Sequence, residues 1–407
     1  MDFLISLAIV TDELSFLDIF LASAIVLLIY IFALSKQNVS ILDPILYYLV
    51  SSYFATTMAT LYWLVNLISD EDFYWICICT FLYYLGFVLT SGFSKEDRIL
   101  LKDNPPKSYL FLILCFFVIN QIVIYSFYGI PLFMSSRLTQ FVDAGGWGVI
   151  SRFSTVLIPY LLFCSFLVYQ KIKINLLLIL LVIVLVIFLS GSKAAILNVF
   201  WFYFIANKII GSKKIKIKAI YFILTFILSL IVIAIQNDFN DFLSAFNQFG
   251  IRLLAFGDVY SYAYINNALK IIAHKDYMAL VYPLLQPLRV ISPDELPIPG
   301  FELYKYVYNW SEASTGPNPR LPVYIDYFYD RYFFIIPMIL GMILGYIRRS
   351  LFCKVQSWSS KCFLSLLYIS FCSAETDPIN TFVSIFNIVL CFAILYIPYI
   401  LIRCAKR

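Results

Sequence analysis

A stretch that combines arginine with glycine is the first candidate for chemistry in this chain. It runs from Arg137 to Arg152 and contains Gly145, Gly146 and Gly148. An arginine side chain can bind a phosphate through two parallel hydrogen bonds, and glycines allow the backbone to approach a ligand closely. The predicted helix that follows would offer its N-terminal N–H groups to an anion. A flexible turn, with Arg152 reaching the membrane surface, explains the same residues, so both interpretations stay open.

Candidates for proton transfer lie further along the chain. His274 is the only histidine, and histidine can act as a base near neutral pH, although a histidine in a polar loop can also be an ordinary surface residue. Asp326 and Asp330 are four residues apart and are predicted to share a helix face. One could accept a proton while the other pairs with Arg331. Alternatively, both mark the N-terminal end of a helix, where acidic residues are favourable.

The elements that position these side chains follow from the composition. Hydrophobic residues make up 62% and charged residues 13% of the 407 residues, whereas a soluble domain is close to half apolar and a quarter charged. Apolar runs long enough to cross a bilayer recur along almost the whole chain. The sequence predicts an all-α polytopic integral membrane protein with about eleven transmembrane helices (ten to twelve), at residues 17–34, 41–68, 73–90, 109–128, 149–169, 174–190, 194–210, 217–236, 332–347, 362–374 and 379–402.

The distribution of charge predicts the topology. Most of the 29 Lys and Arg residues fall in alternate loops, which places those loops in the cytoplasm. The N-terminus is then outside and the C-terminus inside. The net charge of +5 reflects this topology and gives no indication of a nucleic-acid partner. We expect a first bundle of about eight helices at 1–236, a large external loop with short helices at 237–331 between the eighth and ninth spans, and the last helices at 332–407.

The large loop concentrates aromatic residues and proline. Phe256, Tyr260, Tyr262 and Tyr264 are predicted to form an interfacial aromatic belt, with stacking against sugar rings as the alternative. Basic residues on the outer side oppose the usual charge bias, so we expect some of them to bind an anion. They are Arg137, Arg152, Lys193, Arg252, Lys270, Lys275, Arg289, Lys305, Arg320 and Arg331.

The whole chain resembles the O-antigen polymerases, the Wzy-type oligosaccharide repeat-unit polymerases. That family has an Arg followed eleven residues later by Gly in each of two external loops. Arg137 with Gly148 and Arg289 with Gly300 match this pattern, one pair in each expected loop. The Ser-Gly-Ser-Lys turn that ends at Lys193 is also similar to the family.

The resemblance implies a metal-independent glycosyltransferase in the bacterial inner membrane. It would transfer an undecaprenyl-pyrophosphate-linked glycan onto a new lipid-linked repeat unit at the periplasmic face, with the bilayer as its surroundings, no cofactor, and possible association with a chain-length regulator. Cations would stabilise the leaving pyrophosphate, and Asp258, His274 or Asp326 would take the hydroxyl proton. The implied pyrophosphate and glycan contacts are Arg137, Gly148, Arg152, Lys193, Arg252, Arg289, Gly300 and Arg320. We expect Arg137, Arg152 and Lys193 to face Arg252 and Arg289 across one cavity that opens outward and is accessible to lipid.

Three other functions are compatible with the sequence. A metal-dependent lipid-sugar glycosyltransferase could use Asp70, Glu71 and Asp72, since hard divalent cations accept such carboxylates, although a solvated acidic turn is the simpler interpretation. An O-antigen ligase would use the same donor and a different acceptor. A flippase or transporter is disfavoured because the spans carry few charges and one loop dominates.

Overall fold

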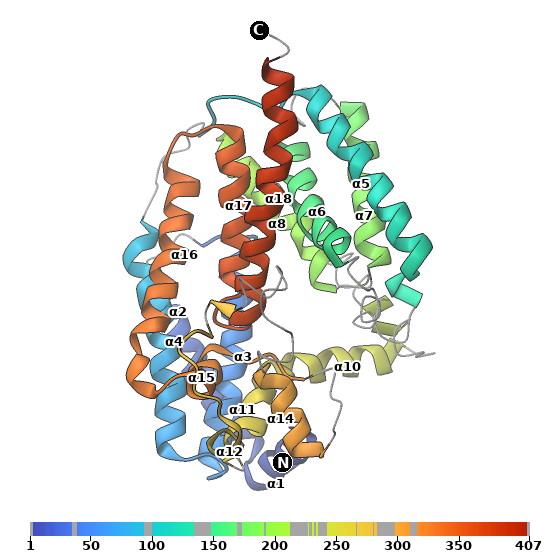
Figure 1. The fold of residues 1–407 in the computed structure, drawn as a ribbon. Helices are drawn as coiled ribbons and strands as arrows, with labels where there is room; N and C mark the ends of the chain where they lie inside the picture. The colour runs from blue at the N-terminus through green and yellow to red at the C-terminus, as the bar shows by residue number, and fades with distance from the viewer. Residues whose placement is uncertain are drawn as a thin grey trace. The chain divides into compact units, whose positions relative to one another are not determined.

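Helix is the dominant element of the computed structural model (Figure 1). The structure describes residues 3–34, 39–92, 100–133, 148–168, 173–190, 193–211, 227, 230–231, 233–234, 242–265, 267–279, 281–282, 298–309 and 316–404. Within these ranges, the only strand-like pairing is an isolated bridge between Leu101 and Gln356. The prediction of an all-α protein is therefore confirmed for this part of the chain.

The first half of the chain forms mostly long helices, and the second half mixes long with short ones. The α-helices are α1 (Phe3–Glu13), α2 (Phe16–Leu34), α3 (Pro44–Leu64), α4 (Asp70–Ser91), α5 (Lys107–Tyr128), α6 (Gly148–Val168), α7 (Lys173–Leu189), α8 (Lys193–Ile210), α10 (Phe242–Leu254), α11 (Asp258–Tyr264), α12 (Ala268–Ile272), α14 (Pro299–Tyr308), α15 (Leu321–Phe328), α16 (Ile335–Cys353), α17 (Trp358–Cys372) and α18 (Pro378–Cys404). Short 3₁₀ turns are η1 (Pro131–Phe133), η3 (Ala255–Gly257) and η6 (Arg331–Phe333).

Several of these helices are long and apolar enough to cross a membrane. Among the described residues, four qualify by length and composition: 70–91, 107–133, 331–353 and 378–397. The helices 3–13 and 16–32 qualify together as a fifth candidate, although they are bent by 111° at their junction. A protein with several membrane-spanning helices is thus supported, and the predicted number of eleven stays a prediction.

The chain divides into two compact units, each assembled from separate segments. Unit 1 comprises Met1–Phe93, Ile251–Arg349 and Tyr368–Phe386. Unit 2 comprises Ser94–Gly250, Ser350–Leu367 and Asn387–Arg407. The predicted division at 1–236, 237–331 and 332–407 follows membrane topology rather than packing, so these units do not test it.

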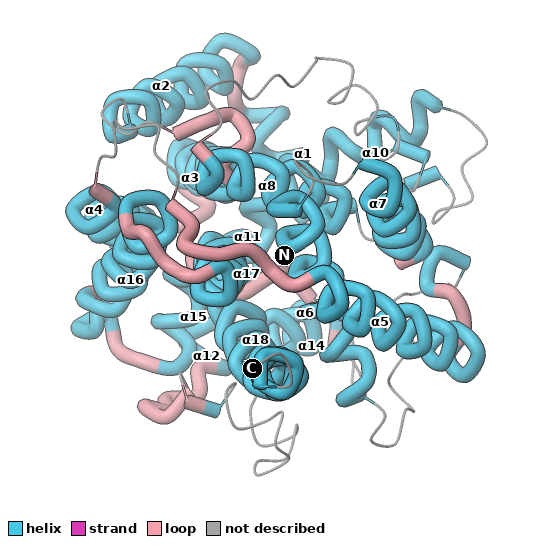
Figure 2. The backbone as a smooth tube through the Cα atoms, turned by 90° about the horizontal axis from the view of Figure 1, so that it is seen from above, coloured by secondary structure: helices cyan, strands magenta, loops and turns pink. Residues whose placement is uncertain are grey.

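Close backbone contact joins α4 and α16 within unit 1. Figure 2 shows the two helices side by side. Gly341 and Gly345 face the carbonyl oxygens of Tyr83 and Phe87, and a methyl group at either glycine would collide with α4. Small residues four apart allow such close approach of helices in a membrane. Thr90 Oγ1 donates a hydrogen bond of 2.8 Å to the Met342 carbonyl, which adds a polar contact to this interface.

The short helices that follow residue 251 pack against the long helices of unit 1. Asn267 and Asn309 adopt positive φ angles of 53°, a conformation that asparagine tolerates better than most residues, and each lies at the edge of a short helix. Tyr260, Tyr262 and Tyr264 of α11 are all buried. The prediction that these tyrosines form an interfacial belt is therefore wrong, because α11 lies inside the unit rather than on its surface.

Unit 2 has its own core, in which tyrosine hydroxyls and a tryptophan ring link neighbouring helices. The Tyr109 hydroxyl lies 2.8 Å from that of Tyr160 and donates to the Leu395 carbonyl at 2.8 Å. The Trp358 ring packs beside Tyr109 at 5.8 Å between centroids. These contacts connect α5, α6, α17 and α18 within unit 2.

Candidate functional site

A buried arginine lies at the centre of unit 1. Arg320 precedes α15 and is 2% exposed. Its Nε donates to Glu375 Oε1 at 3.2 Å and its Nη2 pairs with Glu375 Oε2. Its other bonds go to Ser51 at 3.2 Å, Ser52 at 3.0 Å and the Phe256 carbonyl at 3.1 Å. A guanidinium has five N–H donors, and these five contacts use all of them.

Because all five N–H donors of Arg320 already have partners, this arginine has no free donor for the predicted binding of a substrate. Glu375 is 1% exposed, so the ion pair is enclosed by protein. A phosphate could bind Arg320 only by displacing one of the present partners. In this conformation the pair connects the start of α15 to the turn between α17 and α18, which is a structural role.

Asp258 lies beside this ion pair at the first position of α11. The preceding turn η3 places the Phe256 carbonyl against Arg320. Burial raises the pKa of the Asp258 carboxyl to about 7, and the Val259 backbone N–H and Arg320 offset part of that effect. A carboxyl with a pKa near neutrality can both give and take a proton, as general acid–base catalysis requires.

A polar cavity of about 390 Å³ lies at the other end of α11. Arg331 forms a two-bond pair with Asp326, each bond 2.9 Å long. It also contacts the Asp72 carboxylate, and the Tyr264 hydroxyl donates to Asp326 at 3.0 Å. Burial raises the pKa of Asp326, while Arg331 and Tyr264 oppose the rise. The lining residues are Glu71, Asp72, Ala263, Tyr264, Asn267, Leu269, Lys270, Ala273, Lys275, Asp326, Asp330 and Arg331.

The two carboxylates of the 326–331 segment have different environments. Helix α15 ends at Phe328, so Asp330 lies outside it, and the prediction that Asp326 and Asp330 share a helix face is wrong. Asp330 instead lies 3.4 Å from the amine of Lys275. Lys275 also donates to the Asp326 carbonyl at 3.0 Å. The pairing of one of the two acids with Arg331 is confirmed, and that acid is Asp326.

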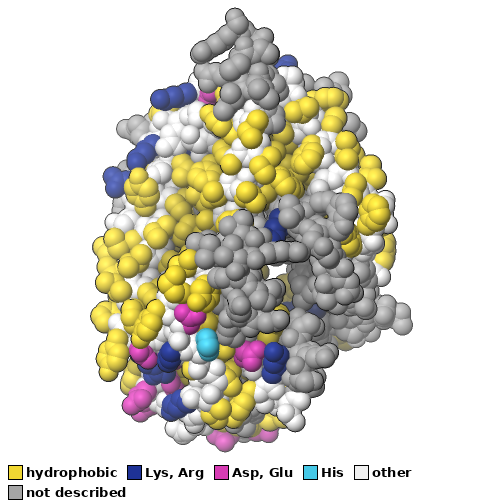
Figure 3. Space-filling view, viewed as in Figure 1, with side chains coloured by type: hydrophobic (Ala, Val, Ile, Leu, Met, Phe, Trp, Pro, Cys, Tyr) yellow, Lys and Arg dark blue, Asp and Glu magenta, His cyan; other side chains and the backbone are white. Residues whose placement is uncertain are grey.

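The surface near this cavity is rich in charge. Figure 3 shows Lys, Arg, Asp and Glu side chains gathered around α12, α14 and α15, below a face of α16 that is covered by hydrophobic side chains. His274 is exposed on the turn after α12 and is absent from the lining of the polar cavity. Lys270 is exposed and lines the cavity.

The remaining predicted contacts are distributed between the units. Arg137 and Arg289 lie outside the described residues. In unit 2, Gly148 begins α6, and the same helix carries Arg152, which is half-buried. Lys193 begins α8 in unit 2, and its side chain lies outside the described part.

Unit 1 contains the other two predicted contacts, Arg252 and Gly300. Arg252 is exposed in the last turn of α10. Gly300 packs against the carbonyl of Pro317, where any Cβ would collide, so close packing explains this glycine without a ligand. The prediction that residues of both units share one cavity stays a prediction.

Sequence reasoning missed Glu375 as a partner of Arg320 and Asp72 as a partner of Arg331. A solvated acidic turn would expose Asp72, whereas its side chain is buried and the residue is 5% exposed. The signal was Ser69 three residues earlier, since Ser-x-x-Asp forms a capping box at a helix start. Ser69 Oγ indeed donates to Asp72 at 2.7 Å, and Asp70 accepts a bond of 2.7 Å from Trp63. The two aspartates of the supposed metal site are therefore each engaged by another side chain.

Comparison of the chain with protein-family models, with curated proteins and with solved structures found no match.

Proposed function

We propose that this protein is a repeat-unit polymerase of the O-antigen type. It would transfer a glycan from undecaprenyl pyrophosphate onto a new lipid-linked repeat unit at the periplasmic face of the bacterial inner membrane. The observation that carries the proposal is the polar cavity beside α11, where acidic and basic side chains and one tyrosine converge, most of them from the segment expected to form the large external loop. The two Arg–Gly pairs, Arg137 with Gly148 and Arg289 with Gly300, support it from the sequence.

The cavity suits the acceptor sugar better than the pyrophosphate. Its walls carry four carboxylates (Glu71, Asp72, Asp326 and Asp330) and three cations (Lys270, Lys275 and Arg331). This excess of negative charge would repel a pyrophosphate. Sugar hydroxyls both donate and accept hydrogen bonds, so they match the mixed lining. The pyrophosphate would then belong to Arg137, Arg152, Lys193, Arg252 and Arg289.

The reaction requires one proton acceptor. The acceptor hydroxyl attacks the anomeric carbon, the bond from that carbon to the phosphate oxygen breaks, and lipid pyrophosphate leaves. Asp326 is the candidate base that lines the cavity, and Asp258 is the candidate whose pKa lies nearest neutrality. His274 is the weakest of the three because it is exposed on a turn.

The fold expected for this function has about eleven spans, an external N-terminus and a cytoplasmic C-terminus. The charged segment 258–331 would lie on the outer side. The acidic start of α4 at Asp70 would share that side, because Arg331 contacts both Asp72 and Asp326.

Complementation tests the proposal. Variants are expressed in a strain that lacks its own polymerase, and the length of the surface polysaccharide is measured on gels. Arg331→Ala, Asp326→Asn and Arg289→Ala are expected to leave mostly single repeats. Lys305→Ala is the control, because Lys305 pairs with Glu302 of the same helix, α14, and does not line the polar cavity, so this variant should leave long chains. Long chains from both Arg152→Ala and Arg289→Ala would refute the pyrophosphate role of these residues.

A further inference from the structure

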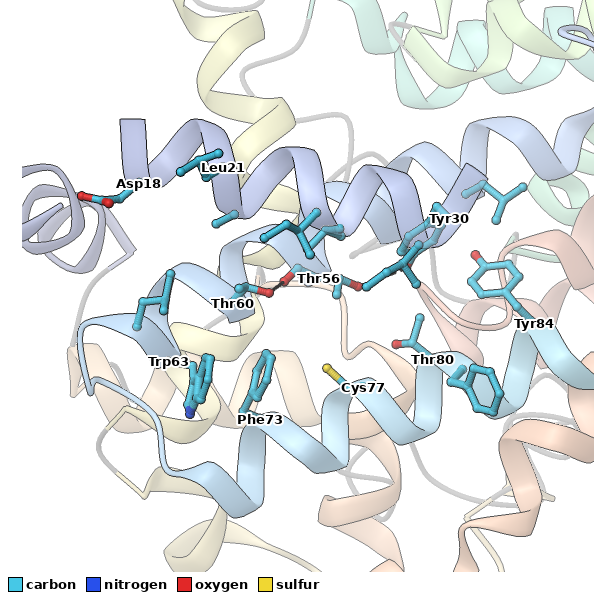
Figure 4. Close-up of a pocket in the computed structure, with 17 residues that line it drawn as sticks. Asp18, Leu21, Tyr30, Thr56, Thr60, Trp63, Phe73, Cys77, Thr80 and Tyr84 are labelled. Atoms are coloured by element: carbon cyan, nitrogen blue, oxygen red, sulfur yellow. Dashed lines mark hydrogen bonds between the residues drawn. The ribbon is translucent and has the colours of Figure 1, made fainter. Parts of the chain in front are cut away.

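A second cavity, of about 580 Å³, lies between α2, α3 and α4 of unit 1. Figure 4 shows α2 along one side and α4 along the other. The rings of Trp63 and Phe73 stack at one end with 4.6 Å between centroids. Tyr30 and Tyr84 meet at the other end, 6.0 Å apart. Its remaining lining is mostly aliphatic, and we call this cavity the α2–α4 groove.

The groove is long. On α2 its lining runs from Asp18 to Tyr30, a rise of about 18 Å at 1.5 Å per residue. The hydrocarbon core of a bilayer is about 30 Å thick, so the groove covers more than half of that depth. α4 qualifies as a membrane-spanning helix, and α2 belongs to the bent pair that forms the fifth candidate.

Most polar side chains in the groove already have partners. Asp18 accepts two hydrogen bonds from Ser15 in a capping box. The Tyr30 hydroxyl lies 3.0 Å from Thr56 Oγ1, and Thr60 donates to the Thr56 carbonyl at 2.8 Å. A ligand therefore meets an almost entirely apolar wall.

Thr80 is the exception. Its side chain is 6% exposed, and its Oγ1 has no hydrogen-bond partner among the residues that the structure describes. Figure 4 shows the Thr80 side chain on the side of α4 that faces α2. A buried polar atom without a partner is uncommon and calls for an explanation. The π bond of an isoprene unit can accept a weak hydrogen bond of this kind, as other π systems do, whereas a saturated acyl chain cannot.

One turn of α4 connects the groove to the polar cavity. Asp72 lines the polar cavity, and the next residue, Phe73, lines the groove. A molecule with a polar head and a long hydrocarbon chain could therefore occupy both sides of this turn. We propose that the α2–α4 groove binds the polyprenyl chain of the lipid-linked acceptor, whose sugar would reach the polar cavity. This inference rests on the proposed function for the identity of the substrate.

Photocrosslinking tests the groove without requiring glycan transfer. The purified full-length protein, in nanodiscs, is irradiated with a polyprenyl phosphate that carries a diazirine in its chain, and crosslinked peptides are identified by mass spectrometry. We expect crosslinks on residues 21–30 and 73–84. Unlabelled polyprenyl phosphate should lower the yield, and the same amount of a phosphatidylglycerol with saturated chains should not. Equal competition by both lipids, or crosslinks confined to other helices, would overturn the proposal.

Matched variants sharpen the test. Leu21→Trp fills the groove, whereas Leu28→Trp adds the same bulk on the exposed side of α2, outside the groove lining. We expect Leu21→Trp to lower crosslinking roughly tenfold, as displacement of about two buried methylene groups would, and Leu28→Trp to leave it unchanged. Thr80→Val keeps the shape and removes the hydroxyl, so it should reduce the preference for the polyprenyl chain over phosphatidylglycerol.

Because crosslinking reports binding alone, it separates this inference from the proposed function. Specific crosslinking in a protein that makes no polymer would leave the groove assignment intact and refute the polymerase. Normal polymer made by Leu21→Trp, together with unchanged crosslinking, would refute the groove.

Discussion

Two arginine ion pairs lie at opposite ends of α16 in unit 1, and they differ in what surrounds them. Arg348 pairs with Asp43 at 2.9 Å, and both side chains are buried. Arg331 pairs with Asp326 at the same distance, but its side chain is 36% exposed and borders a cavity. From Ile335 to Arg348 the helix rises about 20 Å, so the two pairs occupy different depths of the unit.

The difference shows when a charged pair in an apolar protein serves structure alone and when it can also bind a ligand. Asp43 caps α3, and the Tyr368 hydroxyl also donates to it. Its oxygens are enclosed by protein, so this pair can only hold α3, α16 and α17 together. Asp326 is likewise engaged, but it faces open space, where a sugar hydroxyl could compete for its oxygens. We call Arg348 with Asp43 the sealed pair and Arg331 with Asp326 the open pair. Breaking the sealed pair is therefore expected to lower stability, and breaking the open pair is expected to lower activity.

The largest effect on stability is expected when the sealed pair is broken. Asp43→Ala leaves the Arg348 guanidinium buried without its carboxylate and removes the cap of α3. We expect a loss of about 3–5 kcal/mol in the free energy of unfolding, measured by denaturant unfolding in detergent micelles. The double variant Asp43→Leu with Arg348→Met should recover much of the loss, because no buried charge then lacks a partner. Additive losses in the double variant would contradict this account.

The second largest effect on stability is expected at the close contact between α4 and α16. Gly341→Val would force a side chain into the backbone of α4 at Tyr83. Overpacking of this kind costs about 1–3 kcal/mol. Ile339→Val is the control, because Ile339 lies on the same helix with its side chain exposed. An unchanged unfolding midpoint for Gly341→Val would show that α4 and α16 can separate without cost.

The sequence predicted the membrane class and the positions of most long helices. It did so because apolar length is a local property, as in α4, α5 and α18. It also selected Asp258, Arg320 and Asp326, which lie on or beside α11 and α15 in unit 1. It could not pair Arg320 with Glu375, because 55 residues separate them and only packing joins the two turns. The same limit applies to Arg331 and Asp72, and to the burial of the α11 tyrosines.

A third effect depends on pH. The pKa of Asp258 is raised to about 7 from an ordinary value of 3.8, so the folded state holds this proton more tightly than the unfolded state does. Between about pH 4 and pH 7 the folded state binds more protons at this site, so stability falls as pH rises, by up to about 1.4 kcal/mol per pH unit.

Asp258→Asn should remove this fall, so the variant should gain stability relative to the unmodified protein as pH rises from 4 to 7 and show a constant difference above that range. The comparison needs unfolding curves at several pH values for both proteins. If the two curves stay parallel from pH 4 to pH 7, the carboxyl of Asp258 does not titrate as described. If Asp258 is also the base, polymer formation by the unmodified protein should rise with pH through about 7, and Asp258→Asn should make no polymer at any pH.

The smallest effect on stability is expected at the open pair, Arg331 with Asp326. Arg331→Gln removes a charge that is more than a third exposed, and solvent screening limits its contribution to about 1 kcal/mol or less. The same change leaves Asp326 and Asp72 without their cation and alters the cavity wall, so polymer length should fall sharply while the amount of folded protein stays nearly constant. Asp43→Ala, in contrast, should reduce polymer only in proportion to the folded protein that remains. If activity per folded molecule falls equally in both variants, the sealed and the open pair do not differ in function. That result would refute the assignment of the polar cavity as the acceptor site.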